Sequence, residues 1–204
     1  MDRRIWIQGM AGAALPAFVA EAGEPVLSIV LDQESPEKSF GRWRGMESFL
    51  VGLGRDGFLP AGSSFKGGSS LLGDFEVNAI LSHERFEMEE SLIKSSGKSA
   101  EWLAESLFSN MSSIDFDGDG HGGEYGDAFI GLKPLHSAAE QPFHFGEYAG
   151  VFRWYSYAIH GTQDESRIGK CVTGGCINVG KEDLLELLQQ LKLGDFVRIT
   201  SEIP

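Results

Sequence analysis

Cysteine is scarce in this sequence: among 204 residues only Cys171 and Cys176 occur. Two cysteines five positions apart cannot provide the disulfide framework that stabilises many small secreted folds, so the fold must depend on its apolar core. Positive charge is also scarce. The formal net charge is −13 and no lysine or arginine cluster follows the N-terminus. Binding to nucleic acid through its phosphate backbone is therefore not expected.

Long apolar runs are absent after residue 22, so the sequence predicts no membrane span once an N-terminal signal is removed. Before that point, Arg3-Arg4 precede an apolar stretch, Ile5 to Ala20, which ends in an Ala20-Glu21-Ala22 cleavage pattern. This order predicts a signal peptide over residues 1–22, and the arginine pair resembles a twin-arginine signal. We therefore expect an exported protein of the periplasm or cell envelope, with one domain over residues 23–204.

Short β-rich runs bounded by Gly, Ser, Asp and Pro dominate the remainder, which predicts a mostly β fold. Two expected helices, Ala100–Met111 and Lys181–Leu193, carry apolar stripes that would pack against the sheet. The Gly-rich segments 54–73 and 112–126 are expected to be loops. The expected strands are Val26–Leu31, Ser48–Leu53, Asp74–Leu81, Asp127–Leu132, Val151–His160 and Asp195–Thr200.

The expected strand Val151–His160 ends at a histidine, and sixteen positions later Gly174-Gly175 precede Cys176. A thiol nucleophile needs a base to form thiolate and amide donors to hold an oxyanion. Residues without Cβ let backbone amides approach a substrate closely. Cysteine is also often a buried small hydrophobe, and histidine a hydrogen-bonded bystander. The residues alone leave the catalytic and the structural interpretation open.

Residues 158–178 resemble the signature of the L,D-transpeptidase catalytic domain (YkuD family), in which His-Gly is followed by Ser/Thr-His-Gly-Cys, a hydrophobic residue, and Arg or Asn. Weaker resemblance extends over most of residues 26–200. The resemblance implies a mixed β-sandwich or barrel-like fold with one or two packed helices. The matching residues are His160-Gly161, Thr173, Gly175-Cys176, Ile177 and Asn178.

Carried over residue by residue, the resemblance implies that Cys176 is the nucleophile, that His160 is its base, and that the Gly161 carbonyl orients the imidazole. The amides of Gly175 and Cys176 would form the oxyanion hole. The implied reaction is acyl transfer on peptidoglycan stem peptides through a Cys176 thioester, with no cofactor. The alternatives are an L,D-carboxypeptidase that uses the same thiol and a non-catalytic wall-binding module. The residues implied to bind substrate are Thr173, Gly174 and Asn178.

The sequence departs from the family pattern in three places. Gly174 stands where the family usually has a second histidine, and Leu72-Gly73 lacks the Thr and Pro of the family's turn. The third departure is an inserted region, residues 82–126, which we expect to cover the cleft as a lid. The sequence indicates no particular oligomeric state.

A metal site is not expected. Asp115, Asp117, Asp119 and Gly120 match the first half of a calcium loop, but Gly126 stands where a bidentate Glu is needed. The histidines show no zinc-ligand spacing such as His-Glu-x-x-His. An acidic turn is the simpler interpretation of the aspartates.

Overall fold

The structure, a computed structural model, describes residues 23–45, 47–116, 118, 120–136 and 143–201. The expected signal peptide, residues 1–22, lies outside the described residues, as do Asp117 and Asp119 of the calcium-like segment. The described residues form many strands and three α-helices, which confirms the mostly β prediction and adds a helix to the one or two expected. In the described part of the chain, no helix has the length and apolar character needed to cross a bilayer.

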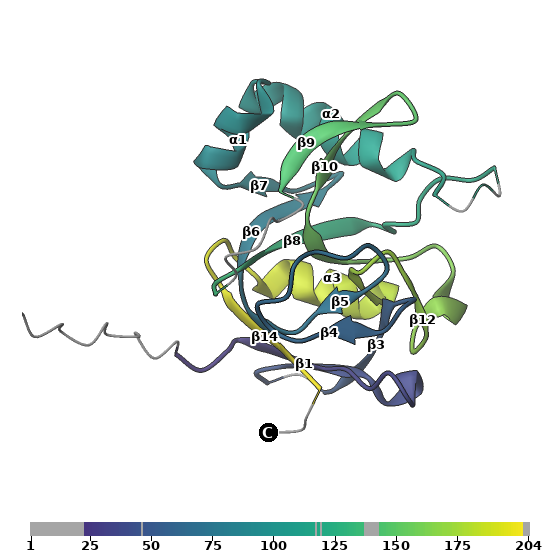
Figure 1. Ribbon diagram of the computed structural model, residues 1–204. Coiled ribbons are helices and arrows are strands. Elements are labelled where there is room, and N and C mark those ends of the chain that lie inside the picture. Colours follow the sequence, from purple (N-terminus) through teal and green to yellow (C-terminus); the bar gives the residue numbers. More distant parts are fainter. Residues whose placement is uncertain (1–22, 46, 117, 119, 137–142, 202–204) are drawn as a thin grey trace, which may run out of the picture.

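A ten-stranded sheet forms the body of the molecule (Figure 1). Its strands follow the order β12-β3-β13-β11-β8-β6-β14-β1-β2, and β2 pairs again with β3, which closes the sheet into a barrel. β7 pairs with the far end of β6, and β4–β5 and β9–β10 form separate two-stranded sheets. The strands are β1 (Leu27–Val30), β2 (Phe40–Trp43), β3 (Phe49–Gly54), β4 (Phe58–Leu59), β5 (Ser70–Leu71), β6 (Gly73–Ser82), β7 (Phe86–Met88), β8 (Ala128–Pro134), β9 (His144–Tyr148), β10 (Val151–Tyr155), β11 (Tyr157–His160), β12 (Cys171–Thr173), β13 (Ile177–Val179) and β14 (Phe196–Thr200).

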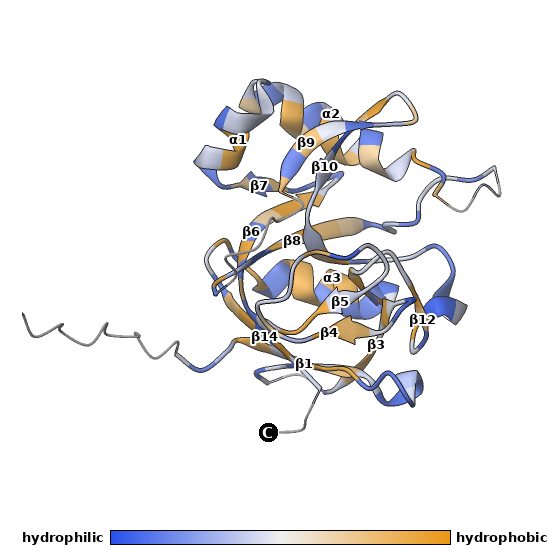
Figure 2. Cartoon of the chain, in the orientation of Figure 1, coloured by the Kyte–Doolittle hydropathy of each residue, from blue (hydrophilic) through white to orange (hydrophobic). Residues whose placement is uncertain are grey.

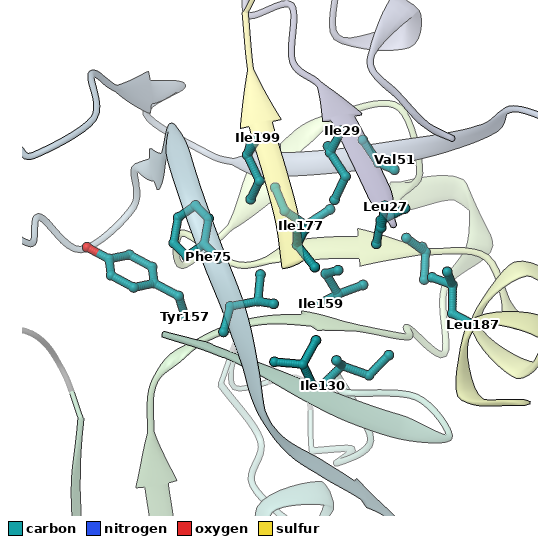
Figure 3. Packing of buried hydrophobic residues seen from close by; sticks show 14 of the residues in the cluster. Leu27, Ile29, Val51, Phe75, Ile130, Tyr157, Ile159, Ile177, Leu187 and Ile199 are labelled. Atoms are coloured by element: carbon teal, nitrogen blue, oxygen red, sulfur yellow. The ribbon is translucent and has the colours of Figure 1, made fainter. Parts of the chain in front are cut away.

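The barrel encloses a first hydrophobic core. Alternation along β1 turns Leu27 and Ile29 inward, where they meet Ile177 of β13 and Ile199 of β14 (Figure 3). Helix α3 (Lys181–Gln190) closes this core with Leu184 and Leu187, and Figure 2 shows that helix apolar along one side and hydrophilic along the other. Leu185, in the same helix, is 43% exposed.

The inserted region builds a second layer above the barrel (Figure 1). Residues 82–126 form β7, helix α1 (Glu90–Ser96) and helix α2 (Ala100–Ser112), and α2 packs against β10. The Ser99 hydroxyl accepts a hydrogen bond from the Trp102 amide, which caps the start of α2. A second hydrophobic core joins these elements, and its fully buried members include Leu103, Leu107, Met111 and Trp154.

The expected strand Val151–His160 is two strands that separate at Ser156. β11 stays in the barrel between β8 and β13, whereas β10 leaves it and pairs with β9. A two-residue turn makes this second pairing possible, because Ala149 and Gly150 take φ values of 49° and 81°, as in the hairpin turn of type I′. The single-strand prediction was therefore wrong, since the same run serves two sheets.

Two further expectations need correction. The segment 54–73, predicted as a loop, contains the short strands β4 and β5, which pair in parallel. The strands β12 and β13 on either side of the glycine pair were not predicted; each has only three residues, too few for a periodic pattern to indicate.

Candidate active site

His160 is the last residue of β11, in the centre of the barrel wall. It is in parallel register with Asn178 of β13, as Ile159 is with Ile177. Register partners in a sheet point to the same face, and residues two apart along a strand share that face. Cys176, two positions before Asn178, therefore lies on the face to which His160 points.

The His160 ring is fixed on several sides. Its Nδ1 is 2.6 Å from the Gly161 carbonyl oxygen, and because a carbonyl can only accept, Nδ1 carries the proton. Nε2 is then the free base. The ring lies edge-on to Tyr125 and stacks on Phe129, and only 7% of the residue is exposed. Burial lowers the pKa of His160 to about 4, against the opposing effect of the Gly161 hydrogen bond.

Cys176 is half-buried and packs against the second hydrophobic core. Its sulfur is 3.9 Å from the Ser156 carbonyl oxygen, to which the thiol can donate, and it accepts from the Ala158 amide. Ser156, at the break between β10 and β11, and Ala158 of β11 thus supply the two contacts. Burial raises the pKa of the Cys176 thiol to about 11, while the Arg153 charge and the Ala158 amide act to lower it.

No hydrogen bond joins the Cys176 sulfur to the His160 ring among the described residues, because the thiol hydrogen bond goes to Ser156. Both side chains nevertheless line one cavity of about 570 Å³. Catalytic hydrogen bonds are often long or misaligned before substrate binds. A rotation about the Cα–Cβ bond of Cys176 is the change required for the sulfur to leave the Ser156 carbonyl.

The turn that carries Cys176 is held by Thr173. Its hydroxyl donates to the Cys176 carbonyl oxygen over 2.5 Å and accepts from the Gly175 amide over 3.2 Å. Gly175 has φ +126°, and a Cβ there would lie 2.7 Å from the Ser69 carbonyl oxygen, so only glycine fits. Of the two amides expected in the oxyanion hole, that of Gly175 is therefore engaged by Thr173 in this structure.

Gly174 and Asn178 differ in their surroundings. Gly174 is exposed, its φ is not positive, and a Cβ there would have no atom within 4 Å. Asn178 is 1% exposed and lies over Gly52, and its Oδ1 has no hydrogen-bond partner within the described part of the chain. The structure thus leaves space at the position where the family has a second histidine.

The cavity lies between the two hydrophobic cores. Tyr157 of the first core and Tyr125 of the second both contribute to its wall. The inserted region adds Phe116 and Glu124 to this wall, as part of a packed layer rather than a detached lid. A larger hollow of about 810 Å³, beside Arg198, contains none of the predicted site residues.

Sequence reasoning missed Arg153 and assigned no binding role to Tyr155, yet both line the cavity. The alternation of β10 could have identified them, because they lie opposite the buried Trp154. At the calcium-like segment, the Asp115 carboxylate accepts from the Gly118 and Gly120 amides, as in an acidic turn. No group of three or more metal-ligating side chains occurs in the part of the chain that the structure describes.

Residues 38–199 match the sequence model of the YkuD family, described as the L,D-transpeptidase catalytic domain. A protein of Fuscovulum blasticum named as an L,D-transpeptidase is 36% identical over 67 residues, which are 33% of this chain and 34% of that protein. The YkuD protein of Bacillus licheniformis, named likewise, is 43% identical over 56 residues, 28% of this chain and 34% of that one. The aligned part thus spans about a third of the length of either curated relative.

Solved structures with similar chains are also L,D-transpeptidases. L,D-transpeptidase 3 of Mycobacterium tuberculosis, in complex with a faropenem-derived adduct, is 14% identical with a TM-score of 0.41, and the match covers 86% of this chain and 60% of that one. An L,D-transpeptidase of Mycobacterium smegmatis is 12% identical with a TM-score of 0.39, over 86% of this chain and 58% of that one. Assignment to a family depends on the sequence match over residues 38–199.

Proposed function

The chain belongs to the YkuD family of L,D-transpeptidase catalytic domains, and we propose that it transfers acyl groups on peptidoglycan stem peptides through a thioester at Cys176. One observation carries the proposal: Cys176, directly before β13, and His160, at the end of the adjacent strand β11, line one cavity, with the imidazole oriented by the Gly161 carbonyl. The proposed substrate is a stem tetrapeptide that ends in D-Ala.

In the first half-reaction, Nε2 of His160 takes the thiol proton as Sγ of Cys176 bonds to the carbonyl carbon that precedes the terminal D-Ala. The resulting imidazolium gives this proton to the leaving nitrogen as the C–N bond breaks. D-Ala departs with a free amine, and the rest of the stem remains on the sulfur as a thioester.

In the second half-reaction, an acceptor amine loses a proton to His160 and attacks the thioester carbonyl. The C–S bond breaks, and the sulfur regains its proton from the imidazolium. Water in place of the amine would make the protein an L,D-carboxypeptidase. The cavity of about 570 Å³ is large enough for the end of a peptide, which supports a peptide substrate over a single amino acid.

The pKa values favour a neutral resting pair. Burial raises the pKa of the Cys176 thiol to about 11 and lowers that of His160 to about 4, so neither group is charged at pH 7. Proton transfer then accompanies attack, as in a serine-type nucleophile, rather than preceding it. We propose the Cys176 amide as one oxyanion donor, with the Gly175 amide joining it when the bond to Thr173 gives way.

We also propose that the protein is exported to the periplasm or cell envelope. Residues 1–22 have the order of a signal peptide, and peptidoglycan lies outside the cytoplasmic membrane. Cell fractionation of the full chain, beside a variant with Arg3 and Arg4 changed to Lys, tests both export and the twin-arginine route. Retention of the wild-type chain in the cytoplasm would contradict the proposal.

Mass spectrometry of the protein after mixing with a tetrapeptide muropeptide tests the function. We expect an adduct on Cys176 equal to the stem minus D-Ala, no adduct in Cys176→Ala, and a strongly slowed one in His160→Gln. Cys171→Ser is the matched control and should keep the adduct, because Cys171 does not line the cavity. Intact binding without an adduct would instead favour a non-catalytic wall-binding module. The reason to consider this alternative is that Gly174 stands where the family usually has a second histidine.

A further inference from the structure

The cavity gathers positive charge in an otherwise acidic protein. Arg55, Arg153 and Arg167 line it, and Glu124 is the only acidic side chain among its described lining residues. The whole chain, in contrast, has a formal net charge of −13. A concave site with walls of low dielectric constant concentrates the field of its charges, so this cavity favours an anionic ligand.

Arg153 is held in place by aromatic rings. Its guanidinium carbon lies 4.0 Å from the ring centre of Tyr155, 4.9 Å from that of Phe116 and 5.7 Å from that of Tyr148. Contacts of this length stabilise a guanidinium through its faces and leave its N–H donors, which lie in its plane, available. The rings come from β10, β9 and the inserted region, so three separate segments fix one cation.

One donor of this cation is buried without a partner. Nε of Arg153 is inaccessible to solvent and has no hydrogen-bond partner within the described residues. A buried N–H that is left unsatisfied is costly, and native structures tolerate few of them. The guanidinium carries further donors on its two Nη atoms, and these form a fork that a carboxylate accepts in a bidentate pair, which a neutral amide cannot match.

Arg153 is also close enough to the nucleophile for its charge to act there. Its charge lowers the pKa of the Cys176 thiol against the larger effect of burial, and both groups act on the Tyr125 hydroxyl. In the proposed acyl donor, only the amide nitrogen and the Cα atom stand between the scissile carbonyl carbon and the terminal carboxyl carbon. Because Arg153 and Cys176 line the same cavity, the cation is within reach of that carboxylate.

We propose that Arg153 binds the C-terminal carboxylate of the acyl-donor peptide and so makes the site select a free acid over the corresponding amide. The inference rests on the proposed acyl transfer, because it assigns the residue that recognises the leaving group. The bound carboxylate would place the scissile carbonyl over Cys176, which makes Arg153 a specificity residue that contacts the substrate.

The test measures binding separately from chemistry. Isothermal calorimetry on the Cys176→Ala protein compares a stem tetrapeptide ending in D-Ala with the same peptide ending in D-Ala amide. We expect the acid to bind roughly 10- to 100-fold more tightly, the range for a hydrogen-bonded charged pair. Adding Arg153→Gln should bring the two affinities together, and Arg153→Lys should restore only part of the difference, because lysine lacks the planar fork.

The matched control is Arg42→Gln, an exposed arginine on β2 outside the cavity, which should leave the preference for the acid unchanged. Equal affinity of the Cys176→Ala protein for both peptides overturns the inference without relying on any Arg153 variant, and so does a preference that survives Arg153→Gln. A preserved preference with no thioester in the wild-type protein would overturn the proposed acyl transfer but leave carboxylate recognition standing. No binding of either peptide would overturn both.

Discussion

The sulfur of Cys176 rests against the Ser156 carbonyl, and the His160 imidazole rests on the Gly161 carbonyl. Each reactive group is thus held by backbone of the β10–β11 region, with His160 buried and Cys176 half-buried. Burial penalises the charged form of each, which raises one pKa and lowers the other. A preformed thiolate–imidazolium pair is therefore disfavoured at the level of these two residues.

This protonation state makes a prediction about thiol reactivity. In Cys171→Ser protein, which keeps only one thiol, the rate of alkylation of Cys176 by iodoacetamide should rise about tenfold per pH unit from pH 6 to pH 10, because only the thiolate reacts and its pKa is about 11. Mass spectrometry of the alkylated fraction gives the rate. A plateau between pH 5 and pH 8 would show an ion pair already present and would refute the neutral-pair mechanism.

The adjacent glycines of the nucleophile turn should respond to substitution in opposite ways. Gly174→Ala should raise the free energy of unfolding by about 0.4–1 kcal/mol, because its φ is not positive, its surroundings are open, and alanine narrows the unfolded ensemble. Gly175→Ala should lower it by about 1–3 kcal/mol through its positive φ and the approach to Ser69. Urea unfolding measures the free energy of unfolding of both variants and of the wild type. A loss of stability in Gly174→Ala would contradict the geometry.

At the scale of elements, the second layer depends on a hairpin that sequence patterns did not indicate. Alternation in residues 151–160 agrees with the observed burial, since Trp154 and Ala158 lie in the second core and Ile159 lies in the first. It could not predict the break at Ser156, because the pattern of side chains continues across it while the pairing partners change. The partner β9 has mostly exposed residues and so leaves little apolar signal.

Longer elements were predicted for the opposite reason. Helix α2 and strand β6 carry apolar patterns over ten residues or more, and the observed bounds, Ala100–Ser112 and Gly73–Ser82, are close to those expected. At the site, the motif pointed to His160 and Cys176, which the fold brings to one cavity. Arg153 matches no motif, and its surroundings are seen only in the structure, where Phe116 of the inserted region and Tyr148 of β9 contact its guanidinium.

The hairpin turn offers a test at this scale. Ala149 has φ 49°, a left-handed conformation that costs a non-glycine residue of this kind about 1 kcal/mol. Ala149→Asn should stabilise the protein by about 0.5–1 kcal/mol, since Asn-Gly is the preferred pair in a type I′ turn. Gly150→Ala, at φ 81°, is the matched control and should destabilise it. Urea unfolding decides the matter: equal stability of Ala149→Asn and wild type would argue against this turn.

At the scale of the whole molecule, the two cores meet around the cavity. His160 belongs to a barrel strand, yet its ring packs on Tyr125 and Phe129 of the second core. A charge on the buried imidazole would therefore destabilise the packing of the two layers against each other. The buried imidazole therefore makes the stability of the folded protein sensitive to acid.

The pH dependence of unfolding tests this coupling. The pKa of His160 is about 4 in the folded protein and about 6.5 when unfolded. Between pH 6.5 and pH 4 the His160 imidazole binds a proton in the unfolded chain but not in the folded chain. The free energy of unfolding therefore falls as the pH drops from 6.5 toward 4, by roughly 3 kcal/mol in total. Chemical denaturation at pH 7, 5.5 and 4 should show this loss.

In His160→Gln the fall in the free energy of unfolding between pH 6.5 and 4 should be smaller by most of that amount, whereas His136→Gln, at an exposed histidine, should follow the wild type. An unchanged pH profile in His160→Gln would mean that the imidazole does not link acid to the packing of the two layers.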